Sequence, residues 1–215
     1  MAMNNLATVY SASGDYSKAG KLLKRVLESL RRKRGSDDPD TLWAMSNLAS
    51  SYAQQGRFSQ AEKLGAEALR RRTVVLGENH PDTLHSMDNL AGFQTDQGRH
   101  GEAEDLYLKT LEGRKQVLGE SNPVTLHSMH NLAILYADLG RYGEAETLNL
   151  QVLERRKSVL GEAHPDTLRS MFRLGRSFAG QGRYEDAEVI LQQALALSSA
   201  SLGNAHGITR MLKRN

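Results

Sequence analysis

The sequence predicts an all-α fold, a right-handed superhelical solenoid of antiparallel helix hairpins. The first observation behind this prediction is a fixed period of 42 residues, which separates the prolines at positions 39, 81, 123 and 165 and also the glycines at 14, 56, 98, 140 and 182. A period of this size indicates a repeat architecture in which every unit is one supersecondary element. The second observation is that apolar residues recur at three- and four-residue steps within each period, whereas no stretch alternates as a strand would.

The period divides the 215 residues into a single array with no internal domain boundary. Met3 aligns with Met45, so the first repeat begins in mid-pattern, and the sixth repeat has barely begun at Asn215. Both ends therefore look cut, and we expect a fragment of a longer array. The predicted repeats run over about 1–38, 39–80, 81–122, 123–164 and 165–206, with 207–215 as the start of a sixth repeat or a capping stub.

The first helix of each repeat is predicted from its start, its apolar stripe and its end. Asn122 precedes Pro123, which combines a capping side chain with a residue whose missing N–H costs nothing in the first turn. Gly140 ends the helix because glycine takes the left-handed conformation easily. The equivalent capping positions hold Asp38, His80 and His164. The apolar stripe consists of Leu126, Met129, Leu132, Ala133 and Tyr136.

A second helix is predicted from Tyr142 to Leu160, ended by Gly161. Its expected buried face consists of Tyr142, Ala145, Leu148, Val152, Leu153 and Val159. Small residues are expected where the two helices cross, at Ala49, Ala91, Ala133 and Gly175 in the first helices and at Ala19, Ala61, Ala103, Ala145 and Ala187 in the second. In the third repeat Gln94 replaces the aromatic residue found elsewhere, and we expect its neighbour Phe93 to compensate in part.

The wording LGE-x-HPDTL…NLA…Y…G-R-Y-x-EAE resembles the tetratricopeptide repeat (TPR) of the kinesin light chain type. The resemblance covers nearly the whole chain, although Gly65 and Asn149 stand where a larger residue is usual. It implies a non-catalytic scaffold for protein–protein interaction, in which the first helices line a concave groove that binds a peptide segment of a partner. It equally implies an alternative, because repeats of this type also form sensor or assembly segments of nucleotide-binding signalling receptors.

Asparagines are the first candidates for contacts in such a groove. Asn47, Asn89 and Asn131 occupy the same place in successive first helices, preceded by Asn5 and replaced by Arg173 in the fifth repeat. An asparagine side chain can donate to a carbonyl and accept from an N–H at once. The resemblance implies that these side chains contact peptide backbone; from the residues alone, they could instead cap or bridge neighbouring helices.

Arg169, Arg173 and Arg176 lie on one side of the fifth first helix. Guanidinium groups bind carboxylates in a bidentate manner, which favours an acidic ligand. Pairing with neighbouring acids such as Glu185, or simple hydration, remains the other interpretation.

Three histidines and the only tryptophan complete the candidate groove. His85 and Asp88 match His127 and His130 on the adjacent first helix, so a zinc site is geometrically conceivable. No further ligand pattern supports it, and we expect groove lining without metal or cofactor. Trp43 is a candidate hot-spot contact, or it covers the N-terminal hairpin.

Composition narrows the remaining functions. The chain has no cysteine, which excludes disulfides and fits a cytoplasmic protein, and no apolar run long enough to span a membrane. Its net charge of +3 does not favour nucleic acid, although basic clusters such as Arg70-Arg71-Arg72 and Arg155-Arg156-Lys157 could form a positive stripe. No phosphate loop, nucleophile elbow or metalloprotease motif is present, so no enzyme is predicted. The apolar second helix near 189–197 is a candidate surface for self-association.

Overall fold

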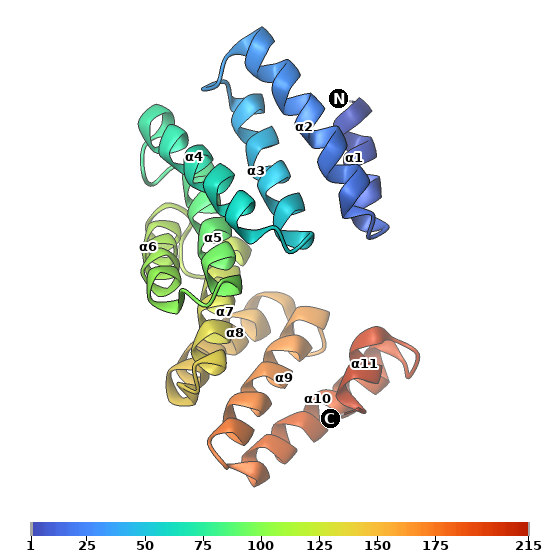
Figure 1. Ribbon diagram of the computed structural model, residues 1–215. Helices are drawn as coiled ribbons and strands as arrows, with labels where there is room; N and C mark the ends of the chain where they lie inside the picture. Colours follow the sequence, from blue (N-terminus) through green and yellow to red (C-terminus); the bar gives the residue numbers. More distant parts are fainter. Residues whose placement is uncertain (1, 215) are drawn as a thin grey trace. The chain divides into compact units, whose positions relative to one another are not determined.

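The computed structural model describes residues 2–214, without the side chains of residues 2–5 and residue 8, and this described part is helical with no strand (Figure 1). The all-α prediction is therefore confirmed. The helices are α1 (Ala2–Ala12), α2 (Tyr16–Arg34), α3 (Pro39–Gln54), α4 (Phe58–Leu76), α5 (Pro81–Asp96), α6 (His100–Leu118), α7 (Pro123–Asp138), α8 (Tyr142–Leu160), α9 (Pro165–Gly180), α10 (Tyr184–Leu202) and α11 (Gly207–Leu212).

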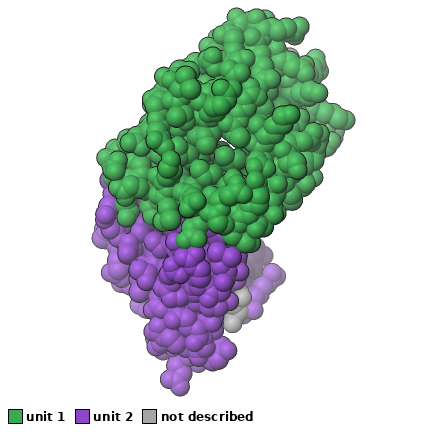
Figure 2. Space-filling view, turned by 60° about the vertical axis from the view of Figure 1, so that its left-hand side comes forward, with its two compact units in different colours: residues 1–117 green, residues 118–215 purple. Residues whose placement is uncertain are grey.

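The chain forms two compact units, residues 1–117 and 118–215 (Figure 2). In unit 1, α1 packs on α2, α2 on α3, α3 on α4 and α4 on α5. In unit 2, the same sequential packing joins α7 to α8, α8 to α9 and α9 to α10, and α11 lies against α9 and α10. Each predicted interval from 39–80 to 165–206 thus contains one helix pair.

The helix ends follow the sequence signals. The side chains of Asp38, His80, Asn122 and His164 each accept a hydrogen bond from the backbone N–H two residues later, at 2.9–3.2 Å. A proline follows each of them in the first turn. Gly140 and Gly161 have φ angles of 74° and 86°, in the left-handed region that ends a helix cheaply. The predicted bounds of α8 are confirmed at both ends.

The core of each unit is built from leucines, methionines and small residues. Leu126, Met129, Leu132, Ala133 and Tyr136 are all buried, as predicted. Both sets of small residues at the helix crossings are buried as well. Gly175 has no room for a methyl group, because a Cβ built there would lie 2.9 Å from the Cγ of Leu191.

Val159 is a wrong prediction. It was expected on the buried face of α8, but its side chain is 58% exposed. The reason is that Arg156, four residues after Val152, continues the inward stripe in the last turn and takes the place next to α9. The stripe therefore ends on an arginine rather than on the valine.

In the third repeat Phe93 compensates in part for the aromatic residue that Gln94 replaces, as expected. Phe93 is buried and packs over Gly65, where an added Cβ would lie 3.1 Å from its Cε2 atom. The glycine thus leaves the room that the phenyl ring uses. Gln94 is also buried, and its Nε2 donates to Glu102 Oε2 at 3.2 Å.

Candidate functional site

The candidate residues lie on one side of each first helix, which we call the first-helix face. It consists of residues four, eight and eleven positions after the proline of α3 and α5 in unit 1, and of α7 and α9 in unit 2. This spacing places side chains on one side of a helix. Trp43, His85, His127, Arg169 and Arg176 are exposed there, whereas Asn47, Asn89, Asn131 and Arg173 are partly buried.

In unit 1 the first-helix face is hollowed between α1 and α3. A cavity of about 420 Å³ opens there, and both Trp43 and Asn47 line it. Trp43 keeps 46% of its surface exposed. The other lining residues are Ala7, Ser11, Tyr16, Leu23, Ser50, Ser51 and Gln54, none of which is charged at neutral pH. The wall is therefore apolar and aromatic with uncharged hydrogen-bonding groups, the composition typical of a ligand site.

His85 and Asn89 contact each other one turn apart on α5. The Nδ2 atom of Asn89 lies 3.2 Å from Nε2 of His85, which fits a neutral ring accepting from the amide. Although the surface of the ring is exposed, desolvation by the surrounding protein lowers the pKa of His85, and the nearby carboxylate of Asp88 only partly opposes this effect. At neutral pH this part of the face therefore presents uncharged polar groups.

In unit 2 the three candidate arginines differ in their pairing. Arg169 is exposed and forms an ion pair with Asp166 at 2.8 Å in the same helix. Arg173 and Arg176 line a pocket of about 20 Å³ between α7 and α9, together with Asp138, Asn149 and Ser177. Within the described part of the chain, neither of these two guanidinium groups forms an ion pair. Burial lowers the pKa of Arg173, as does the charge of Arg176, while Asp138 opposes the change.

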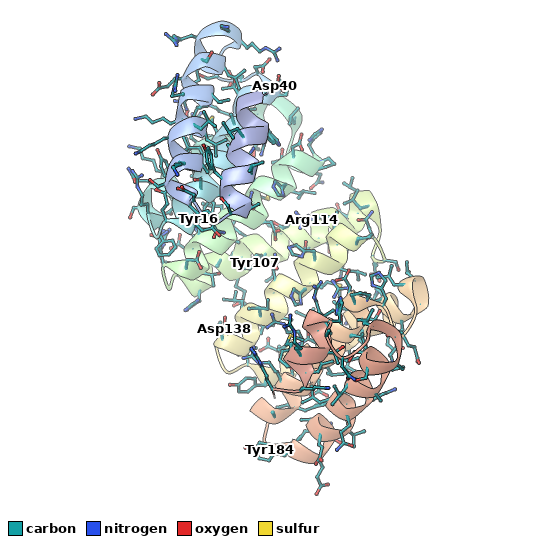
Figure 3. The ribbon with its side chains drawn as sticks, turned by 90° about the vertical axis from the view of Figure 1, so that its right-hand side faces the viewer. Tyr16, Asp40, Tyr107, Arg114, Asp138 and Tyr184 are labelled. Carbon is teal, nitrogen blue, oxygen red and sulfur yellow. The ribbon has the colours of Figure 1, made fainter. Side chains whose placement is uncertain are left out.

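The floor of this pocket is polar because Asn149 replaces a larger residue. Its Nδ2 donates to Ser177 Oγ at 3.1 Å, and both side chains are buried. Asp138 lies at the end of α7, where Figure 3 labels it. The site thus offers two cations, one carboxylate and neutral polar groups within one unit.

His127 and His130 lie together on α7, with ring centroids 6.3 Å apart. Burial, with Arg173 and Arg156 as further causes, lowers the pKa of His130 to about 4. This ring is therefore neutral at physiological pH. The described residues contain no group of three or more histidines, aspartates or glutamates that could hold a metal ion.

Sequence reasoning missed three arginines beneath the first-helix face, which we call the inward arginines: Arg72, Arg114 and Arg156. Each lies 33 residues after the proline of its repeat, near the end of a second helix. Arg72 is only 4% exposed and donates to Ser46 Oγ at 2.9 Å, to Ser86 Oγ and to the Asp82 carbonyl at 3.3 Å. The 42-residue spacing was the signal that could have revealed them.

The other two inward arginines have different partners. Arg114, labelled on α6 in Figure 3, forms a buried ion pair with Asp88 at 3.3 Å. Arg156 donates to Ser170 Oγ at 2.8 Å and to the Asp166 carbonyl at 3.2 Å. Since Arg72 and Arg114 are buried, they cannot belong to an exposed positive stripe. Arg71 and Arg155 pair with Asp37 and Glu120, which reduces that stripe further.

The family model of the tetratricopeptide repeat matches residues 1–73, 46–116, 87–158 and 126–200, so the chain belongs to the TPR family. Its structural neighbours include TPR proteins of the kinesin light chain kind. Two crystal structures of a kinesin light chain of Podosopora anserina with nearly identical TPR-like repeats are 27% identical, with TM-scores of 0.84 and 0.82.

These two alignments cover 94% and 93% of this chain and 95% of the other chain in both cases. BtubC (BKLC) of P. vanneervenii is 24% identical, with a TM-score of 0.82 over 94% of this chain and 80% of that one, and supports the fold alone. None of the curated proteins compared with the chain matches it. Within residues 2–214, no helix has both the length and the apolar character that crossing a membrane requires.

Proposed function

We propose that the chain is a non-catalytic, cytoplasmic protein-interaction module whose first-helix face binds an acidic peptide segment of a partner protein. The observation that carries this proposal is that Arg173 and Arg176 lie beside a pocket and form no ion pair with any described residue. Elsewhere in unit 2, Arg141 and Arg183 form ion pairs with Glu144 and Glu146 at 2.5 and 2.9 Å. Two adjacent guanidinium groups without such partners are suited to a carboxylate supplied by a ligand.

The asparagines supply the second part of the proposal. Asn47, Asn89 and Asn131 recur eight residues after the proline and keep partial exposure. Within each unit these amides can donate to and accept from a peptide backbone. In unit 2 the arginines beside Asn131 select acidic side chains. The exposed rings of Trp43, His85 and His127 add apolar contact area beside them. TPR proteins typically bind other proteins, which supports the class of partner.

Charge reversal at the arginines tests this function. Acidic peptides that bind the native chain are first selected on a peptide array. The double variant Arg173→Glu and Arg176→Glu should reduce the affinity for these peptides by at least tenfold, or more than about 1.4 kcal/mol. The matched control is Arg210→Glu with Lys213→Glu, because it changes the charge equally at two exposed positions, one in α11 and one directly after it, in the same unit. Equal binding by the arginine variant and the native chain would remove the acidic-ligand proposal.

A second candidate is an oligomerisation or sensor segment of a larger multidomain signalling protein. Tyr184 and Val189 on α10 support it, because they are 71% and 68% exposed. Leu191, Leu195 and Leu197, the residues first expected to mediate association, are instead partly buried in a cluster that includes Ile208 and Leu212 of α11. Light scattering over a range of concentrations distinguishes the candidates: association lost in Tyr184→Ser with Val189→Lys supports assembly, and a native monomer excludes it.

A further inference from the structure

The inward arginines differ in how their charge is balanced. Arg72 is almost fully buried, and the acceptors it contacts are two serine hydroxyls and a carbonyl, none of which carries a charge. Arg156 is likewise held by a serine hydroxyl and a carbonyl. Of the three inward arginines, only Arg114 forms an ion pair with a carboxylate of the described residues, that of Asp88. Burial lowers the pKa of both Arg72 and Arg156, with Asp82 and Asp166 as the respective opposing charges.

One position in the first helix accounts for this difference. The seventh residue after the proline is Ser46 in the second repeat, Asp88 in the third and His130 in the fourth. Ser46 contacts Arg72, and Asp88 contacts Arg114. His130 lies close enough to Arg156 for the charge of the guanidinium to lower its pKa. The neutral residues leave the arginine charge in place, whereas the aspartate cancels it.

A buried cation acts on its surroundings over a longer range than an exposed one. The attraction between charges grows as the effective dielectric constant falls, and mobile ions screen a buried group less. Arg72 contacts Ser46 and Ser86. These serines are the sequence neighbours of Asn47 and His85, which lie on the first-helix face. The Arg156 guanidinium lies near Arg169 and His130. Each therefore contributes positive potential to the first-helix face from beneath.

We propose that Arg72 and Arg156 act as fixed positive charges beneath the first-helix face that attract the carboxylates of a partner segment, and that the seventh residue after the proline sets this charge. This inference rests on the proposed function and deepens it. It adds a site in unit 1, where the face carries no exposed arginine of its own, and it explains why the region around Asp88 and Arg114 contributes none. The ligand that fits is a segment with several carboxylates rather than one acidic residue.

The test uses two peptides of equal length, acetyl-hexaglutamate amide and acetyl-hexaglutamine amide, with the full chain. The variants Arg72→Met and Arg156→Met remove the charge, and methionine keeps much of the side-chain volume. The serines that they leave retain hydrogen bonds to the carbonyls of Leu42, Asp82 and Asp166 within their own helices. The matched control is Asp88→Ser with Arg114→Met, which removes a neutral pair and leaves the net charge unchanged.

We expect each single variant to weaken hexaglutamate binding by about three- to tenfold, as removal of one partly screened charge predicts. The control should stay within twofold of the native chain, and hexaglutamine binding should not change with any variant. Ser46→Asp should reproduce the loss of Arg72→Met, because it places a carboxylate where Asp88 lies in the next repeat. Agreement between these two chemically different variants assigns the effect to charge rather than to packing.

A measurement without peptide gives an independent readout. By nuclear magnetic resonance the pKa of His130 should rise by about one in Arg156→Met, because a nearby positive charge is gone. An unchanged pKa together with unchanged hexaglutamate affinity overturns the inference but leaves the proposed function standing. If the native chain binds hexaglutamate no better than hexaglutamine, the acidic-ligand function fails, and this inference fails with it.

Discussion

The two units share one repeat pattern but differ in the chemistry of the first-helix face. In unit 1 the first-helix face is uncharged and aromatic, with a cavity lined by Trp43 and Asn47. In unit 2 the equivalent positions of α9 hold Arg169 and Arg173, and the pocket there is lined by cations and a carboxylate. The central apolar positions of the first helices are the same in both units, with Leu42, Met45 and Leu48 matched by Leu168, Met171 and Leu174. The fold therefore constrains these core positions and leaves the first-helix face free to vary.

The largest expected effect is on stability, and it should differ between two inward arginines, Arg114 of unit 1 and Arg156 of unit 2. Arg114→Ala leaves the buried carboxylate of Asp88 without its cation, and we expect a loss of about 3–5 kcal/mol in the free energy of unfolding. Arg156→Ala should cost only about 1 kcal/mol, because its acceptors are neutral and Ser170 keeps its hydrogen bond to Asp166. Urea denaturation measures both. Similar losses in the two variants would contradict the comparison, and Asp88→Ser should restore the Arg114 variant in part.

The next largest effect is the pH dependence of stability that His130 of unit 2 should produce. The pKa of His130 is about 4 in the folded protein and near 6.5 in the unfolded chain, so below pH 6.5 the unfolded state binds the additional proton. Its contribution to stability is complete above pH 6.5 and is lost as the pH falls toward 4. We expect a loss of about 2 kcal/mol, allowing for the partial solvent contact of the ring. His130→Gln should flatten the unfolding profile between pH 6.5 and 4; an unchanged profile would show that the ring is not desolvated.

The cavity in unit 1 predicts a different dependence on salt. For peptides selected on the native chain, Trp43→Ala should weaken binding by about tenfold with the salt dependence unchanged, because a hot-spot aromatic contributes buried area rather than charge. The double variant at Arg173 and Arg176 should instead reduce the salt dependence. Titrations at two salt concentrations separate the two contributions. Trp43→Phe is the conservative control and should retain most of the affinity.

The smallest expected effect is at a helix start. Asn122→Ala removes the side chain that accepts from the Val124 N–H at 2.9 Å, at a cost of about 1 kcal/mol. Asn122→Asp keeps the acceptor and should retain the stability of the native chain. Thermal unfolding of the three proteins checks the order. A stability loss in the aspartate variant as large as that in the alanine variant would show that the hydrogen bond is not the cause.

The fold was predictable because its signals are local and repeated. Asn122 with Pro123 starts a helix, Gly140 ends it, and the 42-residue period repeats both signals at each unit. Val159 was misplaced because a valine in an apolar stripe was favoured over an arginine four residues after Val152. The inward direction of Arg156 follows from the neutral acceptors that α9 offers, and helical periodicity does not show these acceptors.

The sequence predicted on which side of α9 the candidate arginines lie, but not how they pair. The sequence places Arg169, Arg173 and Arg176 on one side of α9, yet only the structure shows that Arg169 is paired and that the other two line a pocket. The cavity beside Trp43 was equally out of reach, because it depends on side-chain rotamers and on how closely two helices approach.

The inward arginines also carry information about the order of the repeats. Arg72, Arg114 and Arg156 are each followed, fourteen residues later, by a serine in the next first helix: Ser86, Ser128 and Ser170. In the first and fifth repeats the arginine's place is taken by Leu30 and Ser198, and the residues fourteen positions later are Ala44 and Leu212. Arg72 with Ser86 and Arg156 with Ser170 are observed donor and acceptor pairs. Exchange of a 42-residue cassette between these two places therefore keeps donor and acceptor together. The positions 30/44 and 198/212 lack this pairing of arginine with serine, so a cassette exchanged there would not form the same hydrogen bond.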